Sequence, residues 1–129
     1  MSYYINKTLK NISFEDGIAR ITESLKNEGF GILTEIDLKA TLKKKLDVDF
    51  YNYKILGACN PGFAYKALLA ENKIGTMLPC NVIVQEKKPG EIEISAVDPM
   101  ASMQAVESEN LGDLAKEVKK KLENCINAL

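Results

Sequence analysis

Two stretches of the chain, YKILGACNP at residues 53–61 and PCNVIV at residues 79–84, decide which fold we expect. Each combines an apolar, strand-like run with a Cys-Asn pair at one end of that run. Asn60 before Pro61 is a strong signal for a helix start. Asn caps helices well, and Pro at the first helical position lacks only an N–H that would have no partner anyway. We therefore expect a strand, a helix that runs to about Asn72, and a second strand.

The chain before this stretch alternates between strand and helix patterns. Residues 3–9 alternate in polarity as a short strand does. Ser13 is placed to cap a helix that ends near Gly29, because apolar residues follow Ser13 at helical spacing. Residues 31–36 form a second strand pattern, and Asp37 is placed to cap a short helix after it.

The chain after the stretch predicts a hairpin and a long helix. Residues 82–85 and 92–97 are apolar and rich in β-branched side chains, and Pro-Gly at residues 89–90 suits the centre of a type II turn. From about Ser108, apolar residues recur every three or four positions, which indicates an amphipathic C-terminal helix. Cys125 falls on its apolar stripe, and we expect it in the core.

Composition and charge narrow the class of protein. The chain has 129 residues, of which 46% are hydrophobic and 27% are charged, and 17 basic residues stand against 18 acidic ones. This near-neutral balance gives no electrostatic reason to expect nucleic acid or an anionic membrane as a partner. Residues 1–9 lack a signal-peptide pattern, and no run approaches the roughly 18 apolar residues of a membrane span. We expect a cytoplasmic protein.

The absence of His excludes several classes of site. Ser-His, Cys-His and His-metal arrangements are all impossible in a chain without that residue. Gly57 and Gly62 are spaced as in a phosphate loop, but no Lys-Ser/Thr pair follows them. Two cysteines without His do not match a zinc knuckle, and they would suit a soft ion such as Cu(I) or a zinc ion shared across a dimer axis. We expect no catalytic residue, no cofactor and no metal, which favours a non-enzymatic protein and leaves catalysis open.

Cys59, Asn60, Cys80 and Asn81 are the candidate site residues. Cys59 immediately precedes the expected helix, whose N-terminal N–H groups and dipole favour a thiolate. If the strands on either side of that helix are antiparallel neighbours, both thiols lie at the same end of the sheet, with Cα atoms within about 10 Å. The alternative is that both are buried hydrophobes, the commonest fate of a free cysteine.

The blocks ILGACNP at residues 55–61 and LPCNV at residues 78–82, together with GILTEID at residues 31–37, resemble the DUF302 family of bacterial and archaeal proteins. The resemblance covers residues 14–104. It implies a single α+β domain over residues 1–129, with a curved, mainly antiparallel sheet covered by helices in the TBP-like order β-α-β-(α)-β-α-β-β-α. It also implies a homodimer, which the open edge of a small sheet favours independently. No catalytic residue can be carried over, because the family is named for lacking a function.

Two functions from different classes follow. The leading hypothesis is a non-enzymatic module that binds a small ligand or a protein partner in a crevice where the Cys59 and Cys80 loops meet. The alternative is a thiol-dependent redox or sulfur-relay protein, in which Cys59 is the nucleophile and Cys80 the resolving partner.

Overall fold

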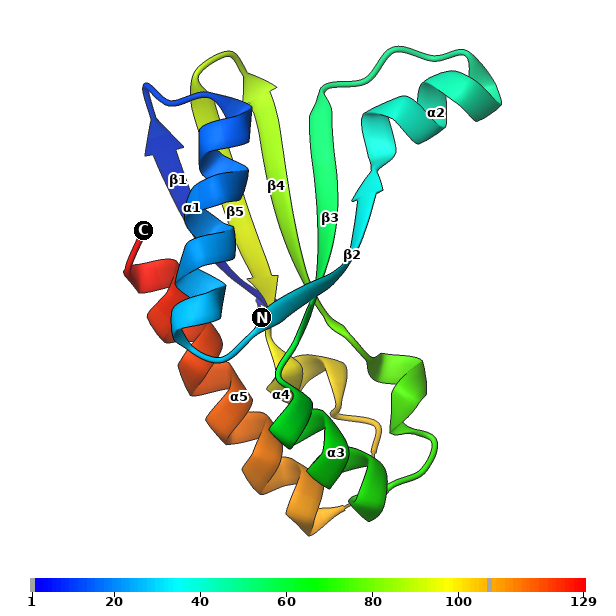
Figure 1. Cartoon of the computed structure of the whole chain (residues 1–129). Coiled ribbons are helices and arrows are strands. Elements are labelled where there is room, and N and C mark those ends of the chain that lie inside the picture. The colour runs from blue at the N-terminus through cyan, green and yellow to red at the C-terminus, as the bar shows by residue number, and fades with distance from the viewer. Residues whose placement is uncertain (1, 107) are drawn as a thin grey trace.

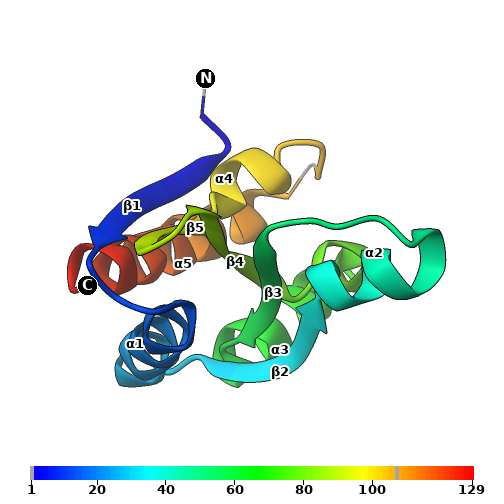
Figure 2. The same ribbon diagram turned by 90° about the horizontal axis from the view of Figure 1, so that it is seen from above.

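The computed structural model describes residues 2–106 and 108–129. Its centre is a five-stranded sheet, and helices α1 and α5 pack against one face of that sheet (Figures 1 and 2). In chain order the elements are β1 (Tyr4–Lys10), α1 (Phe14–Asn27), β2 (Gly31–Asp37), α2 (Leu38–Leu46), β3 (Asn52–Cys59), α3 (Pro61–Ala70), the short 3₁₀ helix η1 (Ile74–Met77), β4 (Cys80–Lys88), β5 (Glu91–Val97), α4 (Pro99–Ser102) and α5 (Glu109–Asn127).

The strands lie in the order β1-β5-β4-β3-β2, and every neighbouring pair is antiparallel. This arrangement confirms the expected α+β class with an antiparallel sheet. The TBP-like description of the order stays a prediction. The short helices η1 and α4 differ from the sequence-based expectation, because four residues are too few to show a helical period.

The main core lies between the sheet and helices α1 and α5. Side chains of β4 and β5 alternate, so that Val82, Val84, Ile92 and Ile94 point towards the helices and are fully buried. Ile21 and Leu25 of α1 and Leu122 and Ile126 of α5 cover them. Burying each such side chain stabilises the fold by about 1.5–3 kcal/mol. Cys125 is 1% exposed in this core, as its place on the apolar stripe predicted.

The hairpin is tighter than the sequence suggested. β4 continues to Lys88, which pairs with Glu91, so only two residues connect the strands. Gly90 has φ +77° and supplies the left-handed conformation that the turn needs. A side-chain oxygen of Glu86 accepts the Gly90 N–H at 3.0 Å, and the strand is irregular between Gln85 and Lys88. This irregularity explains why the predicted strand ended too early.

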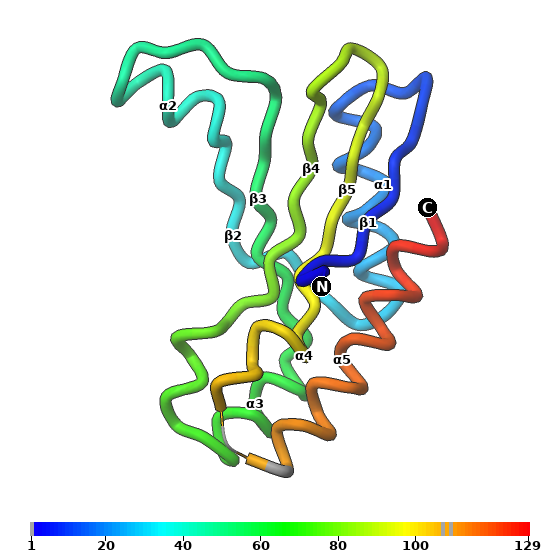
Figure 3. The backbone as a smooth tube through the Cα atoms, turned by 180° about the vertical axis from the view of Figure 1, so that it is seen from behind, coloured from blue at the N-terminus to red at the C-terminus, as the bar shows by residue number. Residues whose placement is uncertain are grey.

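Helix α2 stands apart from the helices that cover the sheet, as the tube view shows (Figure 3). Within Leu38–Leu46, all of which the structure describes, no side chain is buried. Leu46, on the expected apolar stripe, is 66% exposed. The strand that leads into α2, β2, forms one edge of the sheet, and its Leu33 is 67% exposed. The β2–α2 arm therefore leaves apolar surface that the described part of the chain does not cover.

A second, smaller apolar cluster lies beyond the ends of β3 and β4. Ala67 of α3, Ile74 of η1 and Leu111 of α5 form its buried centre, and Leu78 and Met103 pack against it. Helix α5 is long enough to contribute to both clusters, and α3 packs against it. No helix within the described residues is both long and apolar enough to cross a membrane.

Candidate functional site

Strands β3 and β4 bring the two candidate cysteines together. Ala58 pairs with Cys80 in the antiparallel register, and Cys59 is the next residue after Ala58. Paired Cα atoms lie at most about 5.5 Å apart, and consecutive ones about 3.8 Å. The Cα atoms of Cys59 and Cys80 are therefore within about 9 Å, and both residues lie at the same end of the sheet, as the antiparallel topology predicted.

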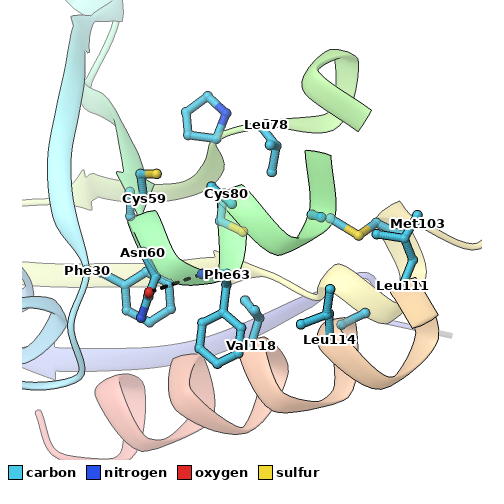
Figure 4. A pocket seen from close by; sticks show the side chains of 15 residues that line it. Phe30, Cys59, Asn60, Phe63, Leu78, Cys80, Met103, Leu111, Leu114 and Val118 are labelled. Carbon is cyan, nitrogen blue, oxygen red and sulfur yellow. Dashed lines mark hydrogen bonds between the residues drawn. The ribbon is translucent and has the colours of Figure 1, made fainter. Parts of the chain in front are cut away.

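A small apolar cavity of about 40 Å³ lies at this end, where the two apolar clusters meet (Figure 4). Cys59, Asn60 and Cys80 all line it. Among the described lining residues, Asn60 is the one whose side chain carries nitrogen or oxygen. The other walls come from α3, the segment before β4, the segment after α4, and α5: Phe63, Ala64, Ala67, Leu78, Met103, Leu111 and Leu114.

Asn60 is the N-cap of α3, as the sequence predicted. Its extended backbone, at φ −102° and ψ 106°, precedes Pro61, and its side-chain Oδ1 accepts the N–H of Phe63 at 3.5 Å (Figure 4). Its amide nitrogen lies beside Gly29, where an added Cβ would come within 3.0 Å of that nitrogen. Asn60 therefore fixes the start of α3 against the end of α1, and this structural role accounts for it.

The two thiols differ in environment. Cys80 is 9% exposed, and this burial, with a smaller contribution from the neighbouring Cys59, raises the pKa of its thiol to about 11. Cys59 is half-buried. Both are free thiols, like Cys125. At neutral pH Cys80 is protonated, and Cys59 is the more accessible of the pair.

Asn81 lies on the other side of the sheet. Successive side chains of a strand point to opposite faces, so Asn81 follows Cys80 in sequence but faces away from the cavity. It lines a wider hollow of about 420 Å³ on the face that α1 and α5 leave uncovered, together with Tyr3, Tyr4 and Tyr53. Cys59, Asn60 and Cys80 thus all border the cavity, whereas Asn81 does not. By the same alternation Cys59, which follows the partner of Cys80, faces away from Cys80.

Gly57 has a structural role beyond its place in the strand pattern. It lies in β3 opposite Asn81, and a Cβ at this position would overlap Oγ1 of Thr34 and come within 2.8 Å of Cγ of Pro79. A side chain there would push the segment before Cys80 away from the strand. A glycine inside an apolar strand signals such close approach of a neighbour, so this feature could have been found.

A family model described as "Domain of unknown function DUF302" matches residues 5–129. The chain belongs to the DUF302 family. In this DUF302 chain the match extends beyond residues 14–104, the range of the sequence resemblance, and takes in most of β1 and the whole of α5.

A solved structure supports the DUF302 fold. The crystal structure of an uncharacterised conserved DUF302 protein from Bacillus stearothermophilus is 27% identical to this chain, with a TM-score of 0.89 and 98% of each chain covered. Among curated proteins, none matches this DUF302 chain. The comparisons therefore establish the family and the fold.

Proposed function

We propose that this DUF302 protein is a non-enzymatic binding module whose ligand occupies the cavity beside Cys59 and Cys80. The observation that carries the proposal is an apolar cavity to whose walls both blocks that carry the resemblance, ILGACNP and LPCNV, contribute. Ligand sites are typically apolar concavities with a few polar groups at one side. Asn60 and the two thiols are those groups here.

The size of the cavity limits the ligand. A cavity of roughly 150 Å³ is known to bind benzene or xenon, and one water molecule needs roughly 10–15 Å³. The observed 40 Å³ therefore suits an ion or a molecule of a few heavy atoms. A larger ligand would require Met103 or Leu114 to move.

Xenon under pressure is the probe that tests the cavity. We expect NMR shifts of the methyl groups of Ala58, Ala64 and Ala67, which line the cavity. Ala67→Leu fills the space and removes those shifts. Ala70→Leu is the matched control, because Ala70 is exposed on the same helix and should leave the shifts unchanged. Xenon shifts that are absent, or that persist in Ala67→Leu, would show that the cavity is not a binding site.

The position of the thiols supports a second candidate, the thiol-dependent redox or sulfur relay. Cys59 and Cys80 lie at the same end of β3 and β4, as a nucleophile and its resolving partner should, but Ala58 and not Cys59 is paired with Cys80, so the two side chains start from opposite faces of the sheet. The raised pKa of Cys80 works against it, because a protonated thiol attacks slowly. Iodoacetamide labelling with peptide mapping separates the two functions. A relay requires rapid labelling of Cys59 near neutral pH, whereas the binding module predicts labelling mainly after unfolding.

We also propose that two copies associate through β2 as a cytoplasmic homodimer. β2 is an edge strand, and Leu33 and Ile36 on it are exposed. The opposite edge, β1, carries Lys7 and Lys10, the kind of charge that blocks edge-to-edge pairing. A second copy that pairs with β2 would cover the exposed apolar side chains of the arm. Reduced thiols, such as those of this chain, are the rule in the cytoplasm.

A further inference from the structure

The sheet face that α1 and α5 leave open carries a hollow of about 420 Å³, which the proposed function does not use. This volume lies within the roughly 300–1,000 Å³ that is usual for small-molecule sites. The hollow and the cavity beside Cys80 share no described lining residue. The hollow is therefore a second place where a ligand could bind, and its lining indicates which ligand.

A row of three polar side chains crosses the hollow. Tyr53 pairs with Gln85 across β3 and β4, and Gln85 pairs with Glu93 across β4 and β5. All three line the hollow, and directly opposite side chains on one face of a sheet have Cβ atoms about 4.5–5.5 Å apart. A flat ring that stacks on Tyr53 would therefore bring one edge to the amide of Gln85 and the carboxylate of Glu93.

The floor of the hollow holds a buried hydroxyl group. Ser95 is 5% exposed although it lies on the face that α1 and α5 leave open. Its Oγ donates a hydrogen bond to Oδ1 of Asn6, which uses its proton and leaves the lone pairs of the oxygen as acceptors. Ile83, which pairs with Ser95 across β4 and β5, makes the neighbouring part of the floor apolar.

Tyrosines from two distant parts of the chain form the walls. Tyr3 and Tyr4 come from the N-terminal end, where their rings meet edge to face with centroids 5.1 Å apart, and Tyr53 comes from β3. Burial raises the pKa of Tyr53, and Tyr51 and Tyr3 add to the rise. The phenol groups of Tyr3 and Tyr53 are thus near enough to interact, which agrees with their lining one space.

The charges of the lining select against anions. Among the described residues that line the hollow, none is Lys or Arg, and Glu93 is the charged one. Nζ of Lys87 lies 3.6 Å from Oε2 of Glu93 and partly neutralises it. Because the carboxylate, the hydroxyl and the amide oxygens all accept hydrogen bonds, the lining matches an uncharged ligand that carries N–H donors.

We propose that the hollow binds an uncharged, amino-substituted heteroaromatic ring of the size of a purine nucleoside. Such rings stack on aromatic side chains and form hydrogen bonds along their edges. Gln pairs with the amino edge of adenine and Glu accepts from the amino group of cytosine, so the row Tyr53, Gln85 and Glu93 contains suitable side chains for this class. This site is independent of the ligand of the proposed function, because it lies apart from the cavity beside Cys80.

Calorimetric titration with adenosine as the probe tests the site. We expect one adenosine per chain. Loss of the stacking surface in Tyr53→Ala should weaken binding by about 5–100-fold, and loss of the charged acceptor in Glu93→Gln by about 5–10-fold. Tyr65→Ala is the matched control, because Tyr65 is 65% exposed on α3 and does not line the hollow. Ala67→Leu, which fills the other cavity, should also leave adenosine binding unchanged.

Two analogues of adenosine test the class of ligand. Purine riboside lacks the exocyclic amino group and should bind about 10-fold more weakly, because it cannot donate to Glu93. Adenosine monophosphate should bind no more tightly than adenosine, because the lining offers its phosphate no cation.

Glu93→Gln keeps the size of the side chain, and it carries the test together with the analogues if Tyr53→Ala does not fold. Adenosine that does not bind at millimolar concentration, that binds equally well to Glu93→Gln, or that binds less tightly than its monophosphate would overturn the proposed site. Xenon shifts from the cavity beside Cys80 are measured separately, so such a result would leave the proposed function standing.

Discussion

Gly57→Ala is the substitution that tests most directly how the site is packed. Gly57 is buried in β3, opposite Thr34 of β2 on one side and Asn81 of β4 on the other. The added methyl group would overlap the hydroxyl of Thr34 and lie 2.8 Å from Cγ of Pro79. The hydroxyl can rotate away, but the Pro79 ring belongs to the backbone next to Cys80 and can move only with it.

The change in the free energy of unfolding caused by Gly57→Ala follows from two opposing effects. Overpacking of this kind typically costs about 1–3 kcal/mol. Replacing Gly by Ala also restricts the unfolded chain, which stabilises the native state by about 0.4–1 kcal/mol. The net expectation for Gly57→Ala is a loss of about 1–2 kcal/mol in the free energy of unfolding. In a chain of this length, that loss corresponds to a fall of roughly 3–10 °C in Tm.

Urea denaturation followed by circular dichroism measures this loss. Gly31→Ala in β2 is the matched control, because a Cβ there would meet no described atom within 4 Å, and we expect no loss of stability or a small gain. Adding Thr34→Ala to Gly57→Ala should recover the part of the lost stability that the clash with Thr34 causes. The loss that remains is due to the contact with Pro79. If Gly57→Ala and Gly31→Ala have the same midpoint and slope, the close approach of Pro79 to β3 is refuted.

Three further predictions concern the helix cap, the hairpin and the assembly. Asn60→Ala should lower the free energy of unfolding by about 1 kcal/mol, measured by urea denaturation, because it removes the cap of α3. Hydrogen bonds from the Gly90 N–H and the Asn52 amide lower the pKa of Glu86, so Asn52→Ala should raise that pKa in an NMR titration. Because a lowered carboxyl pKa stabilises the fold above the unfolded value and the gain is lost as pH falls through the folded value, the deficit of Asn52→Ala should shrink under acid conditions. Light scattering should give about twice the chain mass of 14.3 kDa, and Leu33→Lys in β2 should halve the measured mass. Leu69→Lys on α3, a similarly exposed site, is the control and should leave the mass unchanged. A monomeric unmodified protein at tens of micromolar would refute the proposed dimer.

Local signals in the sequence predicted most of the fold. Ser13, Asp37 and Asn60 all cap helices with their side chains, as predicted, because capping depends on a few neighbouring residues. The C-terminal helix begins next to Ser108, about where its periodicity was expected to start. The turn at Gly90 was predicted for the same reason. The separation of α2 from the helices that cover the sheet was not predicted. Its apolar stripe has the same periodicity whether or not another element covers it.

The candidate site was predicted in part. The proximity of Cys59 and Cys80 followed from topology, since an antiparallel pair begins and ends at the same edge. Asn81 was grouped with them because the strand was expected to start at Val82. The structure starts β4 at Cys80, so the alternation of side chains separates the two residues. The contribution of Met103 depends on how the segment after α4 folds back over the cavity, which no local pattern encodes.

Small side chains maintain the cavity. Ala58, Ala64, Ala67 and Ala115 all line it, at the boundary between the two apolar clusters. An empty space of 40 Å³ costs about 1 kcal/mol at roughly 24 cal/mol per Å³, and a larger side chain at one of these positions would recover part of that energy. If Ala67→Leu stabilises the protein and also abolishes the xenon shifts, then the alanines leave open a space that stability alone would fill. That result would show that binding, and not packing, explains the small residues at this boundary.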